Sequence, residues 1–215
     1  MTDWYRRKTW TKNDEDEFFT KLHKAKIDKQ VQYLRIQAIE LMKTNNEAYL
    51  DVVEKLLNKI LIDYLDNNFE KSLVFNTLGE IYLKKENYEK ALSYFAKSLA
   101  FEKEFPNLIT TSYLNFSETV IKTKKIELYE EVEKILLKKI EKDTFRLPAH
   151  DYIAYSVLSV ISDFKGDIDK AKNYAVLVEK NATTKTNGLV NVHKRKIGLV
   201  KERKTWLDKL LRKDY

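Results

Sequence analysis

Residues 72–105 constrain the fold most, because they read as two amphipathic helices joined by a tight turn at Glu86-Asn87. One face of the first helix carries large residues three and four positions apart, namely Phe75, Leu78 and Tyr82. The matching face of the second helix carries Ala91, Phe95 and Ser98. The small residues Gly79 and Ala91 allow the two helices to approach closely, and aromatic rings fill the space beside that contact. The stretch therefore predicts a tightly packed helical hairpin.

This order of large and small residues resembles the tetratricopeptide repeat (TPR). The positions that carry the resemblance are Phe75, Leu78, Gly79, Tyr82, Ala91, Phe95 and Ser98. The pattern returns less closely over residues 107–180, first at Tyr113, Phe116, Ser117 and Val120, and then at Tyr155, Leu158, Ser159 and Ala171. There the turn contains Gly166, and Asp167 can cap the following helix. A more distant version over residues 28–65 places Leu34, Ala38 and Leu41 at the same positions.

The resemblance implies an all-α fold, a right-handed α-α superhelix of TPR-like helical hairpins with a C-terminal basic capping helix. We expect one continuous domain in three parts: an N-terminal arm and first helix (1–27), the repeat array (28–184) and the basic C-terminal helix (185–215). That last helix is predicted from about Leu189 to Leu211, since a terminal repeat needs cover for its apolar face.

Composition agrees with a helical protein. Only 4 glycines and 2 prolines occur in 215 residues, which argues against an all-β fold with its many turns. The absence of cysteine excludes disulfides and thiolate metal sites. No apolar run approaches the ~18 residues of a membrane span, and the charged start M-T-D-W-Y-R-R-K is unlike a secretory signal. We therefore expect a cytoplasmic protein.

The net charge of +7 is concentrated at the two ends. Residues 185–215 hold ten Lys/Arg against three carboxylates, and residues 1–12 hold four against one. Trp4, Tyr5 and Trp10 interleave with the N-terminal cations, a mixture that can stack on nucleic-acid bases. Alternatively, these aromatic residues fold back over the end of the helical stack. The possible basic surface comprises Arg6, Arg7, Lys194, Arg195 and Lys201.

Residue patterns typical of catalysis are absent from the sequence. The three histidines, His23, His150 and His193, lie far apart, and no H-E-x-x-H, phosphate loop or G-x-S-x-G is present. We predict no catalytic, cofactor-binding or metal-binding residues, no cofactor and no enzymatic activity.

The resemblance implies a protein–protein interaction scaffold that binds a protein or peptide in a concave groove. The groove residues that it implies are Leu73, Asn76, Glu80, Leu83, Lys84, Glu118, Lys122, Ser156 and Asp163. Glu80 and Lys84 are spaced so that they can pair on one helix face. Two alternatives stay open: nucleic-acid binding through the basic termini, and a dedicated inhibitor or immunity-type partner of another bacterial protein. The partner, the pathway and the oligomeric state are not encoded in any motif.

Overall fold

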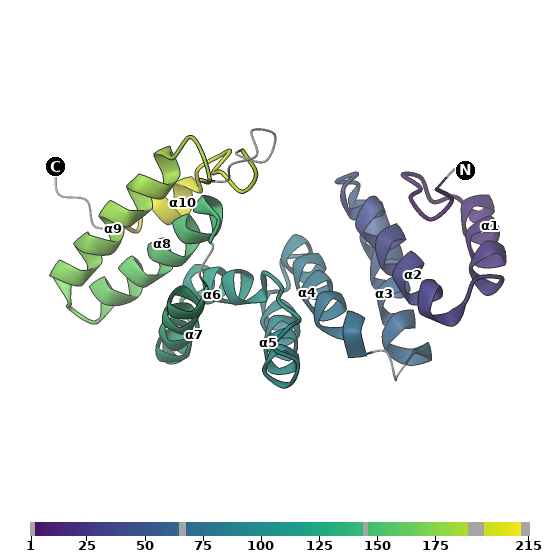
Figure 1. The fold of residues 1–215 in the computed structure, drawn as a ribbon, viewed down its shortest axis with the longest axis horizontal. Coiled ribbons are helices and arrows are strands. Elements are labelled where there is room, and N and C mark those ends of the chain that lie inside the picture. Colours follow the sequence, from purple (N-terminus) through teal and green to yellow (C-terminus); the bar gives the residue numbers. More distant parts are fainter. Residues whose placement is uncertain (1–2, 65–67, 144–145, 189–195, 212–215) are drawn as a thin grey trace. The chain divides into compact units, whose positions relative to one another are not determined.

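The computed structural model describes residues 3–64, 68–143, 146–188 and 196–211 (Figure 1). Those residues form helices and connecting segments without strands, as the sequence predicted. The helices are α1 (Lys12–His23), α2 (Ile27–Met42), α3 (Leu50–Asp63), α4 (Asn68–Lys84), α5 (Tyr88–Glu104), α6 (Ser112–Thr123), α7 (Tyr129–Lys142), α8 (Pro148–Phe164), α9 (Ile168–Thr183) and α10 (Thr205–Asp208), with 3-10 turns η1 (Glu47–Tyr49) and η2 (Ile126–Leu128). The chain forms two compact units, Met1–Ser112 and Tyr113–Tyr215. The right-handed superhelix and the three-part division remain predictions.

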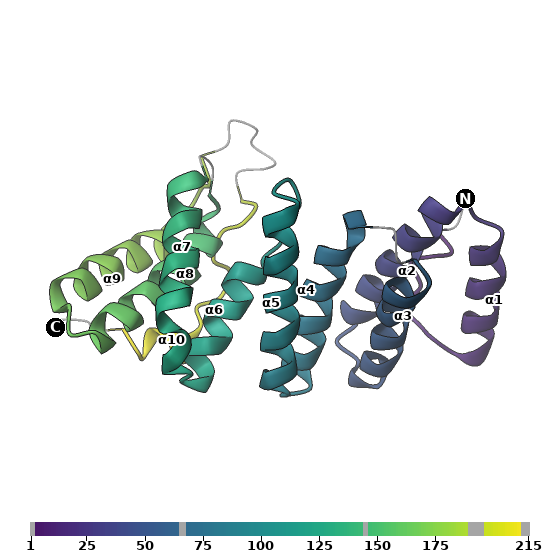
Figure 2. The same cartoon turned by 90° about the horizontal axis from the view of Figure 1, so that it is seen from below.

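The hairpin of α4 and α5 has the close contact that its small residues predicted. The two helices run side by side (Figure 2). A Cβ atom placed on Gly79 would lie 2.3 Å from the ring of Phe95. Ala91 and Phe95 are fully buried, and the rings of Tyr82 and Tyr94 stack with centroids 5.4 Å apart. The absence of a side chain at Gly79 therefore sets the distance between the helices.

The hairpin of α8 and α9 in the second unit repeats this arrangement. Ser159 occupies the position of Gly79, and its hydroxyl donates a 2.7 Å hydrogen bond to the carbonyl of Ala171 on the facing helix. Both residues are buried. Asp167 caps α9 by accepting from the amide of Lys170. The prediction of a hairpin here, with Gly166 in its turn, is confirmed.

One residue with positive φ lies in each of four helix-to-helix connections. They are Asn45, Glu86, Lys124 and Gly166, with φ of 53°, 55°, 54° and 79°. A residue in the left-handed conformation commonly ends a helix, and the chain then turns toward the next element. Glycine adopts this conformation without strain and asparagine tolerates it, whereas Glu86 and Lys124 are residue types that rarely adopt it.

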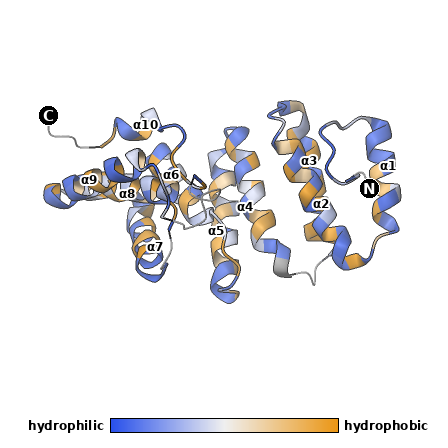
Figure 3. Ribbon diagram, turned by 45° about the horizontal axis from the view of Figure 1, so that its top comes forward, coloured by the Kyte–Doolittle hydropathy of each residue, from blue (hydrophilic) through white to orange (hydrophobic). Residues whose placement is uncertain are grey.

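The first unit has a core in which the apolar faces of α1 to α4 meet. Phe18, Leu34, Leu57 and Leu78 are among its fully buried residues. Figure 3 shows apolar residues alternating with polar ones along these helices, and the apolar ones supply this core. The predicted distant repeat over residues 28–65 corresponds to α2 and α3, with η1 preceding α3.

The N-terminal residues fold back onto the first unit. The rings of Trp4 and Trp10 lie 5.4 and 5.3 Å from that of Phe18. The buried amide of Gln37 accepts from the backbone N–H of Arg7 at 2.9 Å and donates to its carbonyl at 2.8 Å. Of the two interpretations of these tryptophans, the one in which they cover the end of the helices is confirmed.

The start of α1 is held by a reciprocal cap. Thr11 accepts from the amide of Asp14, and the carboxylate of Asp14 accepts from the amide of Thr11 at 2.9 Å. The backbone N–H of Thr11, followed by its hydroxyl and the guanidinium of Arg7, lowers the pKa of Asp14 to about 2. With Thr11 as the N-cap residue, α1 starts at Lys12.

The prediction of a long C-terminal helix from Leu189 to Leu211 is wrong for the described residues. Residues 196–204 are not helical, and α10 spans only Thr205–Asp208. The cause lies at Gly198, whose φ is +71° and whose absent Cβ would lie 2.7 Å from Leu147. The carbonyl of Gly198 accepts a 2.7 Å hydrogen bond from the amide of Ala149, which satisfies a first-turn donor of α8. Packing against α8 therefore replaces helix formation here.

We expect Gly79→Leu to lower the free energy of unfolding by at least about 2 kcal/mol, because overpacking a close contact outweighs the gain in helix propensity. Thermal and urea unfolding will measure the loss. Ala96→Leu is the matched control, since Ala96 is an exposed position of α5 and surface substitutions stay within about 0.5 kcal/mol. Equal stability of Gly79→Leu and the parent would contradict a close contact at Gly79.

Candidate protein-interaction surface

The residues predicted for the groove on α4 differ in exposure. Lys84 is exposed, Leu73, Glu80 and Leu83 are half-buried, and Asn76 is buried. Lys84 donates to the side chain of Asn45 at 3.2 Å and does not form the pair with Glu80 that the four-residue spacing allowed. Glu80 instead accepts from the amide of Asn76 at 2.9 Å. Of these five residues, only Asn76 is buried, and Glu80, Leu83 and Lys84 lie together near the C-terminal end of α4.

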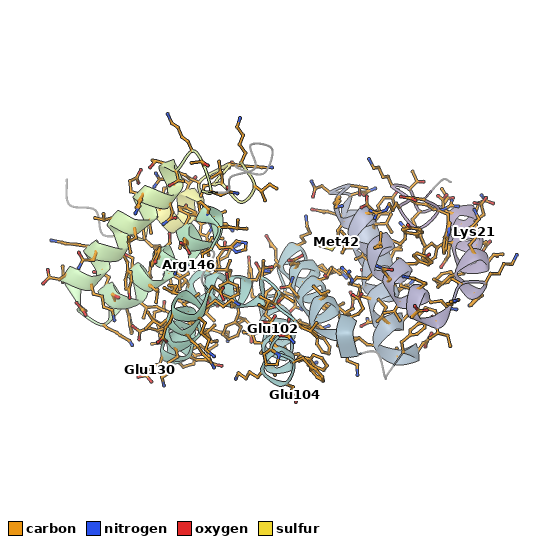
Figure 4. The ribbon with its side chains drawn as sticks, in the orientation of Figure 1. Lys21, Met42, Glu102, Glu104, Glu130 and Arg146 are labelled. Carbon is orange, nitrogen blue, oxygen red and sulfur yellow. The ribbon has the colours of Figure 1, made fainter. Side chains whose placement is uncertain are left out.

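Asn76 belongs to a buried polar junction at which α4, α5 and the start of α6 meet. Its side-chain oxygen accepts a 2.8 Å hydrogen bond from the hydroxyl of Ser112. Thr110 donates through both its amide and its hydroxyl to Glu102 on α5, which is labelled in Figure 4. Ser98, one turn earlier on α5, donates to the carbonyl of Ser72 at 2.9 Å. No local sequence pattern indicates this junction, because only the fold brings these residues together.

A second polar cluster joins α3 to the C-terminal end of α4. Tyr82 and Lys85 both donate to the carboxylate of Glu54, and Lys85 also pairs with Asp51 at 2.7 Å. Burial, followed by the hydrogen bond to Glu54, raises the pKa of Tyr82 to about 12. The ammonium groups of Lys85 and Lys90 lie 5.7 and 4.9 Å from the centroid of the Tyr82 ring. These contacts hold α3 against α4.

The predicted groove residues of the second unit also differ in exposure. Ser156 is fully buried and donates to the carbonyl of Tyr152 within α8. Asp163 is half-buried and Lys122 is exposed. Glu118 on α6 forms an ion pair with Lys204, 86 residues along the chain. One predicted groove residue is thus already bound by the protein's own C-terminal segment.

The C-terminal segment, residues 196–211, is held by polar contacts centred on Tyr152. The hydroxyl of Tyr152 accepts from the amide of Lys204 at 2.9 Å and donates to Asp208 at 3.0 Å. Arg203 pairs with Asp208 at 2.7 Å and with both carboxylate oxygens of Glu179 at 2.9 Å. Burial raises the pKa of Tyr152 to about 12, with the bond to Asp208 adding to the effect. The segment contacts α6, α8 and α9.

The candidate basic surface is partly neutralised in the first unit. Arg7 forms ion pairs with Asp14 and Glu17, and Arg6 pairs with Asp3 at 3.2 Å and with Glu40 at 3.4 Å. Lys201 is exposed. Lys194 and Arg195 lie outside the described residues, as does His193. Nucleic-acid binding remains a hypothesis, but two of its five cations already have carboxylate partners.

The described residues contain no group of three or more His, Cys, Asp or Glu side chains arranged to hold a metal ion. His23 is exposed on α1, and His150 is half-buried with Nδ1 3.4 Å from the hydroxyl of Tyr113. Burial, followed by the nearby charge of Lys139, lowers the pKa of His150. Within the same ranges, no helix has the length and apolar character required to cross a bilayer.

The family model described as tetratricopeptide repeat matches residues 74–105. This segment comprises most of α4 and all of α5, the hairpin that contains the Gly79–Phe95 contact. Residues 74–105 are therefore similar to a tetratricopeptide repeat in both sequence and fold. No curated protein and no solved structure matches the chain. The repeat is generally a protein-interaction fold without catalytic activity, which supports a role in protein–protein contacts.

We expect Asn76→Ala and Lys84→Ala to affect stability differently, although both residues were predicted to line one groove. Asn76→Ala leaves the buried hydroxyl of Ser112 and the half-buried carboxylate of Glu80 without this partner, and the loss of a partner for a buried polar group costs about 1–3 kcal/mol. Lys84→Ala alters an exposed contact and should change stability by less than about 0.5 kcal/mol. Urea unfolding of both variants is the measurement. Equal, small effects would show that the junction around Asn76 does not stabilise the first unit.

We expect the protein to lose stability as the pH rises from 10 to 12. Tyr82 has a pKa of about 12 when folded and an ordinary value of 10, so over this range the unfolded chain releases the proton first. The contribution of its neutral phenol is complete below pH 10 and is lost as the pH rises through 12. Unfolding of the parent and of Tyr82→Phe at pH 9 and 11.5 will test this. A decline that is as steep in Tyr82→Phe would exclude Tyr82 as a cause.

Proposed function

We propose that the protein is an interaction scaffold that binds an extended segment of a protein partner along the polar face of α4. The observation that supports this is the position of Glu80, Leu83 and Lys84. They lie on the first helix of the tetratricopeptide repeat, and all three are at least partly accessible to solvent. An extended segment has unpaired backbone groups, and Glu80 and Lys84 offer an acceptor and a donor to bind them.

The chemistry of this surface favours a polar segment of mixed charge. One carboxylate and one ammonium group lie four residues apart on α4, with Leu83 between them in sequence. The tetratricopeptide domains that hold chaperone tails use lysine and asparagine at positions occupied here by Asn76 and Glu80. Because Asn76 is also buried in the junction with Ser112, a C-terminal carboxylate is not the expected ligand.

The test uses a peptide library displayed on phage and selected against the immobilised full chain. The affinity of each enriched peptide is then measured for the parent and for the double variant Glu80→Ala/Lys84→Ala. Each hydrogen bond that is lost should weaken binding by about 0.5–1.5 kcal/mol. The double variant should therefore bind several-fold to more than tenfold less tightly.

A matched control exists on the second helix of the same repeat. Lys103→Ala/Glu104→Ala removes the same two charges from exposed positions of α5, and it should retain parental affinity. Circular dichroism must show that both double variants keep the helical content of the parent. If the peptides bind the two double variants equally well, the α4 face is not the binding surface.

A further inference from the structure

The C-terminal segment meets the second unit in the manner of a peptide ligand. Residues 196–204 are not helical, and the one helical turn that follows, α10, comprises four residues. Lys204 is the centre of the contact: its amide donates to the hydroxyl of Tyr152 on α8, and its ammonium group pairs with Glu118 on α6. Backbone and side chain of one residue are thus recognised by two different helices.

Charge complementarity supports this description. The receiving helices contribute the carboxylates of Glu118 and Glu179, and the segment contributes the cations of Lys204 and Arg203. Glu118 is among the residues that the repeat resemblance assigns to partner binding. The segment therefore places a basic side chain where the side chain of a partner is expected.

The segment also buries fewer residues than α8, which has ten buried residues. Leu207 and Leu211 are buried, whereas Lys209 and Leu210 are exposed. The Nη2 atom of Arg203 is buried without a hydrogen-bond partner among the described residues, and an unsatisfied buried donor disfavours the docked state. Few buried apolar contacts are typical of segments that open locally while the rest of a fold stays intact.

We propose that Glu118, Tyr152 and Glu179 form a second peptide-binding site, specific for an extended basic segment, and that residues 196–211 occupy it as an internal ligand. This inference deepens the proposed function and rests on it, since it assumes that repeat helices of the chain bind partner segments. A partner with a similar basic segment gains access only when the internal one leaves. The site is therefore autoinhibited in the isolated chain.

The experiment uses full-length variants and a fluorescein-labelled synthetic peptide of residues 196–211. Lys204→Glu places a carboxylate opposite Glu118, which should release the internal segment. Because apparent affinity scales with the fraction of open sites, the peptide should bind Lys204→Glu about tenfold or more tightly than it binds the parent. Hydrogen exchange of residues 199–211 should rise in the same variant.

Three further variants make the result specific. Lys209→Glu introduces the same charge change at an exposed residue of the same segment, and it should bind the peptide no better than the parent. Glu118→Lys/Lys204→Glu restores the ion pair in reverse and should return hydrogen exchange to the parental rate. If Lys204→Glu loses helical content, Gly198→Ala replaces it, because the added methyl group displaces the segment from Leu147 at its other end.

Two outcomes would overturn the inference. The first is unchanged exchange in Lys204→Glu and Gly198→Ala, since the segment would then be an integral part of the fold. The second is increased exchange without peptide binding, since the exposed surface would then have no affinity for a basic segment. Neither result depends on Glu80 or Lys84, so failure here is distinguishable from failure of the proposed α4 surface.

Discussion

The close approach of paired helices is the constraint on which the rest of this structure depends. In the first unit, the ring of Phe95 occupies the space that a side chain at Gly79 would need. In the second, Ser159 fills the equivalent position and hydrogen-bonds to the backbone of the facing helix. In the first hairpin, the helices approach closely because Gly79 has no side chain. In the second, they approach closely because the small side chain of Ser159 hydrogen-bonds to the facing helix.

The sequence was sufficient to predict both of these hairpins, because small and large residues at helical spacing leave a local signal. It was not sufficient for the C-terminal segment. The leucines and valines of residues 189–211 have a helical period, but Gly198 packs against Leu147, 51 positions earlier, and takes a left-handed conformation there. No local pattern encodes such a partner. The role of Gln37, whose amide pairs with the backbone of Arg7, was unrecognisable for the same reason.

At the candidate site, the repeat pattern predicts which helix face a residue lies on but not whether that residue is exposed. The repeat pattern assigned Asn76 and Lys84 to one surface, yet the structure buries Asn76 at the junction with Ser112 and leaves Lys84 exposed. The spacing of residues on a helix fixes which face they share, whereas exposure depends on what covers that face. In the second unit, Glu118 is bound by Lys204, which belongs to a segment that the repeat pattern does not include.

Some lysines of the chain also form cation–π interactions with its own aromatic rings. Lys85 and Lys90 lie over the ring of Tyr82, and Lys97 lies over that of Tyr94. Acetylation of a lysine removes both its charge and its attraction to an aromatic ring. Acetylation of these lysines would therefore remove attractions within the hairpin of α4 and α5 as well as surface charge.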